Sequence, residues 1–186
     1  MSLCHGLGRR AGKVRVTGNQ PMDQAPGSGS LRPTHFLFVA GALRERSSQD
    51  SAQLQLGHGL WGIRSALIEK NLSQYLSDHS RGLVYVLKVG LCAEFEIRSR
   101  VLPFAQLDDL AQDELRTETR FGFVRLKVVR RWESSADASF ALLQRVLEVP
   151  DRAELTRRLN LGMHGLSQAE YEAMARELGE GLSEPD

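Results

Sequence analysis

Residues 93–101 alternate between two kinds of side chain along the whole stretch. Small and apolar residues hold one set of alternate positions, and the other set is charged: Glu94, Glu96, Arg98 and Arg100. Because successive side chains of a β-strand point to opposite faces, the pattern predicts a strand with one buried and one solvated face. The preceding run, 83–89, is apolar at both sets of positions, which predicts a central strand of the same sheet.

Further strands and helices are predicted on either side of this pair. Runs of β-favouring residues at 35–40 and 120–129 predict two more strands. Apolar residues at helical spacing predict a short helix after Ile63 and helices at 138–149, 151–159 and from Ser167 onward, the last two opening with capping motifs. The acidic stretch 104–118 indicates a short helix and an exposed loop. Residues 42–56 are polar and mixed, and no regular element is predicted there.

The composition of residues 1–33 differs from that of the rest of the chain. This stretch is rich in Gly, Ser, Pro, Gln and Arg with little apolar periodicity, which predicts a disordered tail, followed by one folded domain at 34–180 and a flexible C-terminus at 181–186. Its acid-free first 22 residues fit an organelle transit peptide and a start at Met22 equally well. The tail carries a formal charge of +4, which leaves −3 for the remainder. Nucleic-acid binding by the domain would therefore depend on a local basic patch.

Cysteine and histidine usage bears on location and chemistry. Cys4 and Cys92 lie in different settings, so no disulfide framework is implied and the cytoplasm is the expected compartment. No run of about 18 apolar residues exists, so no membrane span is expected. The histidines lack metal-ligand spacing and the nucleophile-elbow motif is missing, so we expect no metal, no cofactor and no catalysis.

Trp61 lies in a glycine-rich stretch, between Gly57-His58-Gly59 and Gly62. This pattern predicts a loop. A tryptophan there offers a flat apolar face with an N–H at its rim, and the adjacent glycines let another backbone or a planar ring come close. Two roles are open for Trp61: it plugs one end of the core, or it forms one wall of a ligand pocket.

The predicted strand at 120–129 combines aromatic and basic side chains. Alternation places Phe121, Phe123, Arg125 and Lys127 on one face. Five basic residues and no acidic residue occur between Arg120 and Trp132. Such a face is either a solvated surface or a surface that contacts phosphates, with aromatic rings available for base stacking.

The order of these motifs resembles the EVE domains of the PUA-like superfamily, which are related to the YTH readers of methylated RNA bases. The resemblance covers about residues 35–178. It rests on the opening aromatic strand 35–40, Leu60-Trp61-Gly62-Ile63 followed by Lys70-Asn71, the paired strands around 95–99, the aromatic and basic strand 120–129, and the closing turn and helix from Leu166. The EVE family usually has a Pro-Gly-Asp turn where this chain reads Ser-Asp-His-Ser-Arg-Gly at 77–82. The aromatic cage that YTH proteins build from several tryptophans is matched here by Trp61 alone.

This resemblance implies an α+β fold, with a small curved PUA-like β-barrel flanked by helices, and a pocket that takes a base, in relatives a modified one, of RNA or DNA. The base-binding residues that it implies are Trp61, Gly62, Asn71, Phe36 and Tyr85. The implied phosphate-binding residues are Lys70, Arg120, Arg125 and Lys127. The expected partner is therefore RNA or DNA, and the oligomeric state is open.

Two functions of other classes are open beside this one. A small enzyme acting on a nucleobase or nucleotide would place His58, His79 or His164 next to a carboxylate beside Trp61. A protein–protein adaptor without base binding would instead show a large exposed apolar patch. The three hypotheses thus differ in what must surround Trp61.

Overall fold

A six-stranded sheet forms the centre of the computed structural model, which describes residues 33–180 except 44, 78, 119 and 134. The predicted tail, apart from Pro33, and the predicted flexible C-terminus at 181–186 lie outside the described residues. The strands are β1 (His35–Ala40), β2 (Leu60–Ile63), β3 (Arg81–Val86), β4 (Gly90–Ile97), β5 (Gly122–Arg131) and β6 (Met163–Leu166). The helices are α1 (Ser48–Gly57), α2 (Ala66–Tyr75), α3 (Asp109–Leu115), α4 (Ala136–Val146), α5 (Arg152–Leu159) and α6 (Gln168–Glu180), with a 3₁₀ turn, η1, at Phe104–Gln106.

The sheet is mixed and curls on itself, with strand order β2-β5-β4-β3-β1-β6. Strand β1 runs parallel to β3, and the other neighbouring strands are antiparallel. A parallel pair needs a long crossover, and here the crossover contains α1, β2 and α2. Strand β3 is central, as its uniformly apolar sequence predicts. The two edges of the sheet are β2 and β6.

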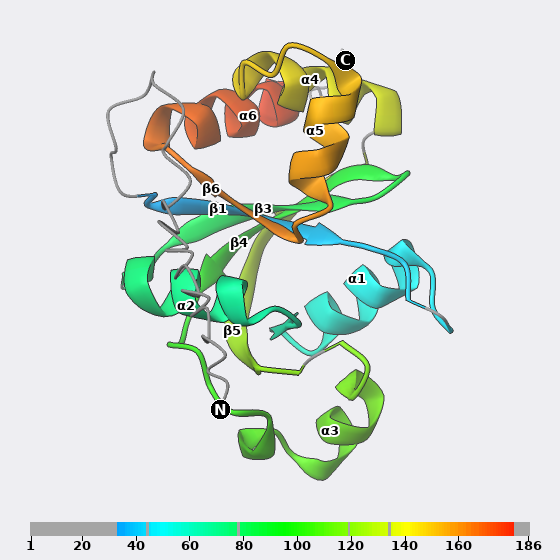
Figure 1. The fold of residues 1–186 in the computed structure, drawn as a ribbon, viewed down its shortest axis with the longest axis vertical. Coiled ribbons are helices and arrows are strands. Elements are labelled where there is room, and N and C mark those ends of the chain that lie inside the picture. The colour runs from blue at the N-terminus through cyan, green and yellow to red at the C-terminus, as the bar shows by residue number, and fades with distance from the viewer. Residues whose placement is uncertain (1–32, 44, 78, 119, 134, 181–186) are drawn as a thin grey trace, which may run out of the picture. The chain divides into compact units, whose positions relative to one another are not determined.

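Apolar clusters lie on both faces of the sheet. The first fills the inside of the curl and includes Phe36, Phe38, Trp61, Phe95 and Val124. The second lies between the opposite face and helices α4, α5 and α6, which gather on one side of β1, β3 and β6 (Figure 1). Helices α1 and α2 lie on the other side of these strands (Figure 1). The expected α+β class with a curved sheet flanked by helices is confirmed.

The charged face predicted for β4 is not solvated. Glu94 is 4% exposed and Glu96 is 9% exposed, and each carboxylate lies against basic or hydroxyl side chains of other parts of the fold. The Tyr171 hydroxyl of α6 donates to Glu94 Oε1 at 2.5 Å. Arg81 and Arg130 lie 3.8 and 3.9 Å from the same carboxylate. The alternation therefore identified the strand, although β4 ends at Ile97 and not at Val101. The prediction of a wet polar face was wrong for Glu94 and Glu96, whereas Arg98 and Arg100, beyond the end of the strand, are exposed.

Three local features also differ from the sequence-based expectation. Trp61 lies in an edge strand, β2, and not in a loop. Residues 48–57, where no element was predicted, form helix α1 with Ser47 as its N-cap. The short strand β6 pairs with β1 and was not predicted either. Each of these segments lacks the apolar periodicity by which an element is recognised.

The capping motifs predicted for the last two helices are present. The Asp151 carboxylate accepts the N–H of Glu154 at the start of α5, at 2.8 Å. At the start of α6, Ser167 and Glu170 exchange hydrogen bonds, each side chain accepting the other's backbone N–H. These bonds satisfy N–H groups that the first helical turn leaves without partners.

Candidate functional site

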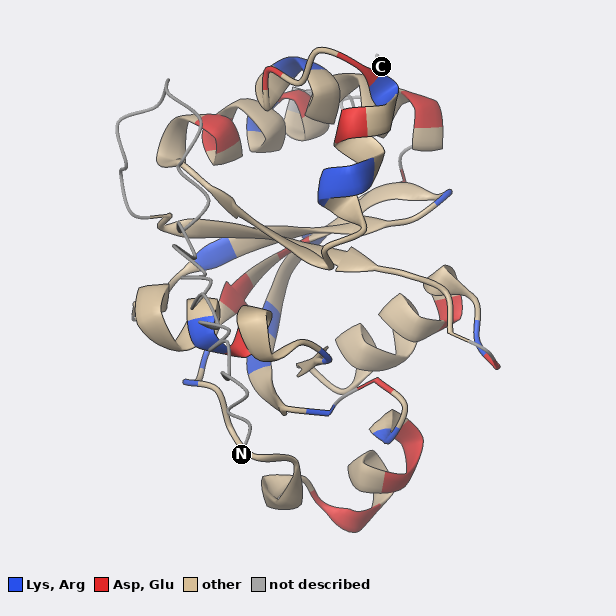
Figure 2. Ribbon diagram, viewed as in Figure 1, with Lys and Arg blue, Asp and Glu red and all other residues tan. Residues whose placement is uncertain are grey.

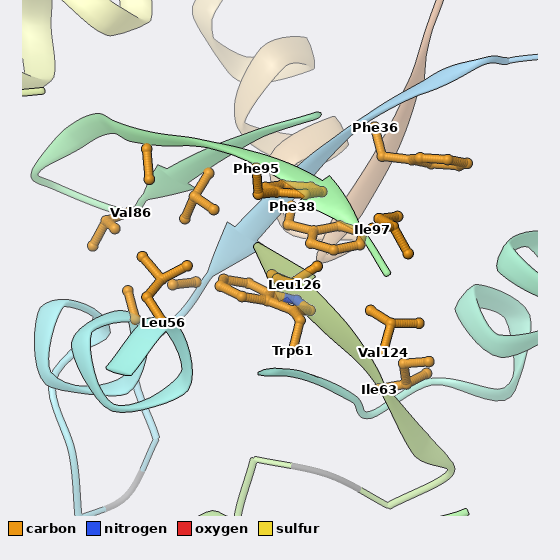
Figure 3. Packing of buried hydrophobic residues seen from close by; sticks show 14 of the residues in the cluster. Phe36, Phe38, Leu56, Trp61, Ile63, Val86, Phe95, Ile97, Val124 and Leu126 are labelled. Carbon is orange, nitrogen blue, oxygen red and sulfur yellow. The ribbon is translucent and has the colours of Figure 1, made fainter. Parts of the chain in front are cut away.

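Three aromatic rings from three strands stack inside the curled sheet. Phe38 of β1 lies between Phe95 of β4, with ring centroids 4.7 Å apart, and Trp61 of β2, with centroids 5.3 Å apart. Figure 3 shows these three rings one over another. Because β1 neighbours the β6 edge and β2 is the other edge, the stack bridges the sheet across its open side. Offset ring pairs of this kind contribute about 0.5–1.5 kcal/mol beyond their buried area.

A cavity of about 220 Å³ lies beside the Phe38–Trp61 pair. Its walls come from β1, from β2 with the start of α2, and from the turn before β6. The lining residues are Phe38, Val39, Ala40, Gln55, Trp61, Gly62, Arg64, Ser65, Ile68, Asn160, Leu161, Gly162 and Met163. Pockets for drug-sized ligands hold roughly 300–1,000 Å³, so this cavity suits a single small planar ring.

The carboxamide of Gln55 fixes the backbone at this cavity. Its Oε1 accepts the N–H of Gly62 at 2.8 Å. Since the N–H and C=O of one residue in an antiparallel strand point the same way, the Gly62 carbonyl also faces away from β5, toward the open edge. The edge strand thus presents a backbone acceptor beside Trp61.

A buried polar network holds Gln55 in turn. Its Nε2 donates to Ser51 Oγ at 3.3 Å and to Glu118 Oε2 at 3.4 Å. The Glu118 side chain is 1% exposed, accepts the Ser51 hydroxyl at 2.7 Å, and pairs with Arg46 at 3.0 Å. Burying a carboxylate is costly unless it is paired and hydrogen-bonded, and Glu118 is both. The position of the Gln55 side chain is therefore fixed by this network of buried side chains.

The residues implied for base binding fall into two groups. Trp61 and Gly62 line the cavity, and Trp61 is also core, at 6% exposed. Phe36 is fully buried, on the Trp61 side of the sheet but not at the cavity. Asn71 is half-buried on α2, whose residue Ile68 lines the cavity instead. Tyr85 belongs to the cluster on the opposite face of the sheet, so the structure does not bring it to Trp61.

The residues implied for phosphate binding are all exposed, and they point in different directions from the cavity. Arg125 and Lys127 project from the outer face of β5, while Val124 and Leu126 project inward. Arg120 precedes β5 and lies next to the last residue of β2, because its backbone N–H donates to the Ile63 carbonyl at 3.0 Å. Lys70 lies on α2. Figure 2 shows basic residues on β5 beside the acidic residues of β4.

Several cavity residues escaped the analysis of the sequence. Phe38 is two residues after Phe36, on the same strand face, so period-2 alternation could have identified it. Arg64 and Ser65 directly follow β2, and their position before a helix was a usable signal. Gln55 and Asn160 carry no such signal, because only tertiary contacts bring them to Trp61.

Two histidines pair with carboxylates, but at other places. His58 Nε2 lies 2.6 Å from Glu114, and His79 Nδ1 lies 2.7 Å from Glu96. None of these four residues lines the Trp61 cavity. Burial lowers the pKa of His164, on β6. Within the described part of the chain, no group of three or more His, Cys, Asp or Glu side chains has metal-binding geometry, and no helix is long and apolar enough to cross a bilayer.

Solved structures with the same arrangement of elements include three informative ones. A hypothetical protein from Leishmania major has a TM-score of 0.52 and 19% identity, over 79% of this chain and 95% of that chain. Human THYN1 protein, in a complex with DNA containing 5-methylcytosine, has a TM-score of 0.51 and 16% identity, over 81% and 99%. The YTH domain-containing protein mmi1, in a complex with RNA, has a TM-score of 0.54 and 9% identity, over 80% and 83%.

The comparisons define the fold of the chain. No protein-family model and no curated protein sequence matches it. The structural likeness nevertheless covers about four fifths of the chain in each case. The described domain therefore shares the fold of the human THYN1 protein and of the mmi1 YTH domain, in agreement with the fold that the order of sequence motifs predicted.

Proposed function

We propose that this domain binds RNA or DNA by inserting one base, carrying a modification, into the cavity beside Trp61. The observation that carries the proposal is the cavity itself, which is bounded by the stacked Phe38–Trp61 pair at the open side of the sheet. Its volume of about 220 Å³ suits one planar ring, and its aromatic wall suits a base taken out of its stack. Human THYN1 and mmi1, which share the fold, were solved with methylated DNA and with RNA.

The polar groups at the cavity suggest how the base edge is recognised. The Gly62 carbonyl, directed by Gln55, can accept a hydrogen bond from an exocyclic amino group, which cytosine and adenine carry. The Ser65 hydroxyl makes no capping bond to α2 and lines the same cavity. Arg64, exposed at the rim, is placed to contact the adjoining phosphate. We retain Asn71 and Lys70 as contacts of nucleotides outside the cavity, with Arg120, Arg125 and Lys127 holding more distant phosphates.

The proposed role is recognition without catalysis, in the cytoplasm. Histidine–carboxylate pairs that could act as acid and base lie away from Trp61. The exposed large apolar residues in the described part of the chain are spread over several elements, which favours a base reader over an adaptor. The cytoplasm is proposed because the two cysteines imply no disulfide framework.

The test is a substitution that fills the Trp61 cavity, followed by a measurement of oligonucleotide binding. Ile68 is half-buried and lines the cavity, so Ile68→Trp should occupy the space of the base. Its neighbour Leu67 is 62% exposed and outside the lining, which makes Leu67→Trp the matched control. We expect fluorescence titration with short oligonucleotides, carrying methylated or plain cytosine or adenine, to show strong loss for Ile68→Trp and none for Leu67→Trp.

The outcomes separate the base reader from the enzyme and from a protein that does not bind nucleic acid. If the wild-type protein binds no oligonucleotide even at low salt, nucleic-acid recognition is wrong. If it binds, but Ile68→Trp binds equally well, the base does not enter this cavity. Mass spectrometry of the recovered oligonucleotide tests the catalytic alternative, because any change in the mass of the base would contradict a reader function.

A further inference from the structure

A second cavity, of about 520 Å³, opens at the other end of helix α2. Its lining is Leu76, Ser77, His79, Ile97, Arg98, Ser99 and Arg100, from the turn after α2 and the end of β4. No described residue lines both this cavity and the Trp61 cavity. Of the residues that line it, only His79 was named from the sequence as a candidate, for the enzyme alternative, and none was named for phosphate binding. The described lining includes two guanidinium groups, one imidazole and two hydroxyls, and no carboxylate.

The two guanidinium groups of this cavity have different partners. Arg98 Nη2 lies 2.8 Å from Glu96 Oε2, and His79 Nδ1 lies 2.7 Å from Glu96 Oε1, so one buried carboxylate holds both side chains in place. Arg100 is exposed and pairs with no carboxylate of the described residues. The cavity therefore combines a fixed cation with one whose charge is not compensated.

Neighbouring groups set the sign of the electrostatic potential. The Ser99 hydroxyl accepts the backbone N–H of Arg125 at 2.9 Å and can still donate its own proton. The C-terminal end of α2 contributes about half a negative elementary charge, which is smaller than the full, uncompensated charge of Arg100. Asp78 stands beside His79 in the sequence and lies outside the described residues.

Helix α2 sets the spacing between the two cavities. Ser65 and Ile68, at its start, line the Trp61 cavity, and Leu76, just after its end, lines the basic one. The helix has 10 residues, which at 1.5 Å per residue separates the two ends by about 15 Å. Nucleotides of one strand rise about 3.4 Å each in a duplex, and more when extended, so about four or five nucleotides cover this distance at most.

We propose that the Arg98–Arg100 cavity binds a backbone phosphate of the same nucleic acid, a few nucleotides away from the base in the Trp61 cavity. This inference rests on the proposed function and adds a phosphate subsite with its own residues. Arg100 supplies the uncompensated charge, Arg98 is held in position by Glu96, and the Ser99 hydroxyl donates a hydrogen bond. Binding there makes affinity depend on oligonucleotide length.

The test compares a mononucleoside with an oligonucleotide of about nine nucleotides that carries the same modified base, a length that exceeds the spacing of the cavities. The variants are Arg100→Gln and Arg100→Glu. The control is Arg145→Gln, which removes an exposed arginine of α4, 62% exposed. We expect Arg100→Gln to weaken oligonucleotide binding about three- to tenfold, and to lower the slope of log affinity against log salt by about 0.7–0.9.

The expected pattern has three parts. Arg100→Glu weakens oligonucleotide binding more than Arg100→Gln, Arg145→Gln leaves it near wild type, and mononucleoside binding is unchanged in all three variants. If Arg100→Gln leaves the affinity and salt slope of the oligonucleotide at wild-type values while Ile68→Trp still abolishes binding, the subsite is wrong and the base pocket stands. If wild-type protein binds neither ligand, the proposed function fails, and the subsite fails with it.

Discussion

The Gln55 carboxamide oxygen accepts the backbone N–H of Gly62 at 2.8 Å, which joins helix α1 to the edge strand next to Trp61. Helix α1 was not predicted from the sequence, whereas the Trp61-Gly62 pair was its most prominent feature. This bond joins the two. Gln55 is 4% exposed and is itself held by Ser51 and Glu118. The backbone at the Trp61 cavity is therefore positioned by a buried polar network and not by β-pairing alone.

Replacement of Gln55 should affect both stability and binding. Gln55→Ala leaves the Gly62 N–H and part of the Glu118 carboxylate without their partners, and we expect the free energy of unfolding to fall by about 1–3 kcal/mol. Urea unfolding measures this loss, and titration with the modified oligonucleotide measures the accompanying loss of affinity. Gln53→Ala, at an exposed position of the same helix, is the control. Equal stability of the two variants would contradict the role given to Gln55.

Gly82 should tolerate no side chain. A Cβ atom at this position of β3 would lie 2.1 Å from the Phe36 carbonyl oxygen and 2.5 Å from Phe95 Cζ. We expect Gly82→Ala to destabilise the protein by more than about 3 kcal/mol, because the backbone of β1 cannot move away without breaking the sheet.

Gly57 provides the matched comparison for Gly82. A Cβ atom there meets nothing within 4 Å, at the last residue of helix α1. We expect Gly57→Ala to be neutral or to stabilise the protein by up to about 1 kcal/mol, since alanine loses less backbone entropy in a helix than glycine. The temperature of thermal unfolding should thus fall for Gly82→Ala and stay unchanged or rise for Gly57→Ala. Similar shifts in the two variants would argue against the close approach of β1 and β3.

The Tyr171 hydroxyl should matter because it ties α6 to the buried Glu94. We expect Tyr171→Phe to lower the free energy of unfolding by about 1–3 kcal/mol, whereas Tyr75→Phe on α2 should have a smaller effect. Burial, together with the hydrogen bond to Glu94, raises the pKa of Tyr171 to about 12.

The pKa of Tyr171 also gives a prediction in alkaline solution. A folded-state pKa above the unfolded value near 10 means that the contribution of neutral Tyr171 is complete below pH 10 and is lost as pH rises through about 12. Ultraviolet titration of tyrosinate in wild type and Tyr171→Phe identifies the late-titrating group. If the Tyr171→Phe variant instead lacks a tyrosine that titrates at lower pH, the raised pKa does not belong to Tyr171.

Glu96 should contribute to stability at neutral pH and lose that contribution in acid. The hydrogen bond from His79 and the charge of Arg98 lower the pKa of Glu96 below its ordinary value of 4.5, although burial opposes them. The contribution is therefore present above the unfolded value and disappears as pH falls through the folded one.

The acid prediction is checked with His79→Asn. Asparagine accepts the left-handed backbone of this position, where φ is 69°, so the variant removes the imidazole without adding strain. We expect the midpoint of acid unfolding, followed by circular dichroism, to move to higher pH than in wild type. An unchanged midpoint would show that His79 does not set the protonation of Glu96.

Local pattern was sufficient where an element has a clear period or a capping residue. The strand expected at 35–40 is β1, and the motif at Asp151 caps α5 as expected. Helix α1 had no such pattern, because the residues that it buries include Ser48, Ser51 and Gln55. Polar residues of this kind are read as exposed unless the partners that satisfy them are known.

The sequence by itself determined the fold class and the central strands, because alternation, capping and aromatic composition act over a few neighbouring residues. Tertiary structure alone decided that Phe38 stacks on Trp61, that Tyr85 lies on the opposite face, and that Glu94 is buried under α6. The physical reason is the curl of the sheet, which brings edge strands β2 and β6 to the same open side although 101 positions separate Gly62 of β2 from Met163 of β6 in the chain. Pairing at that distance depends on packing of the whole core, which no local pattern records.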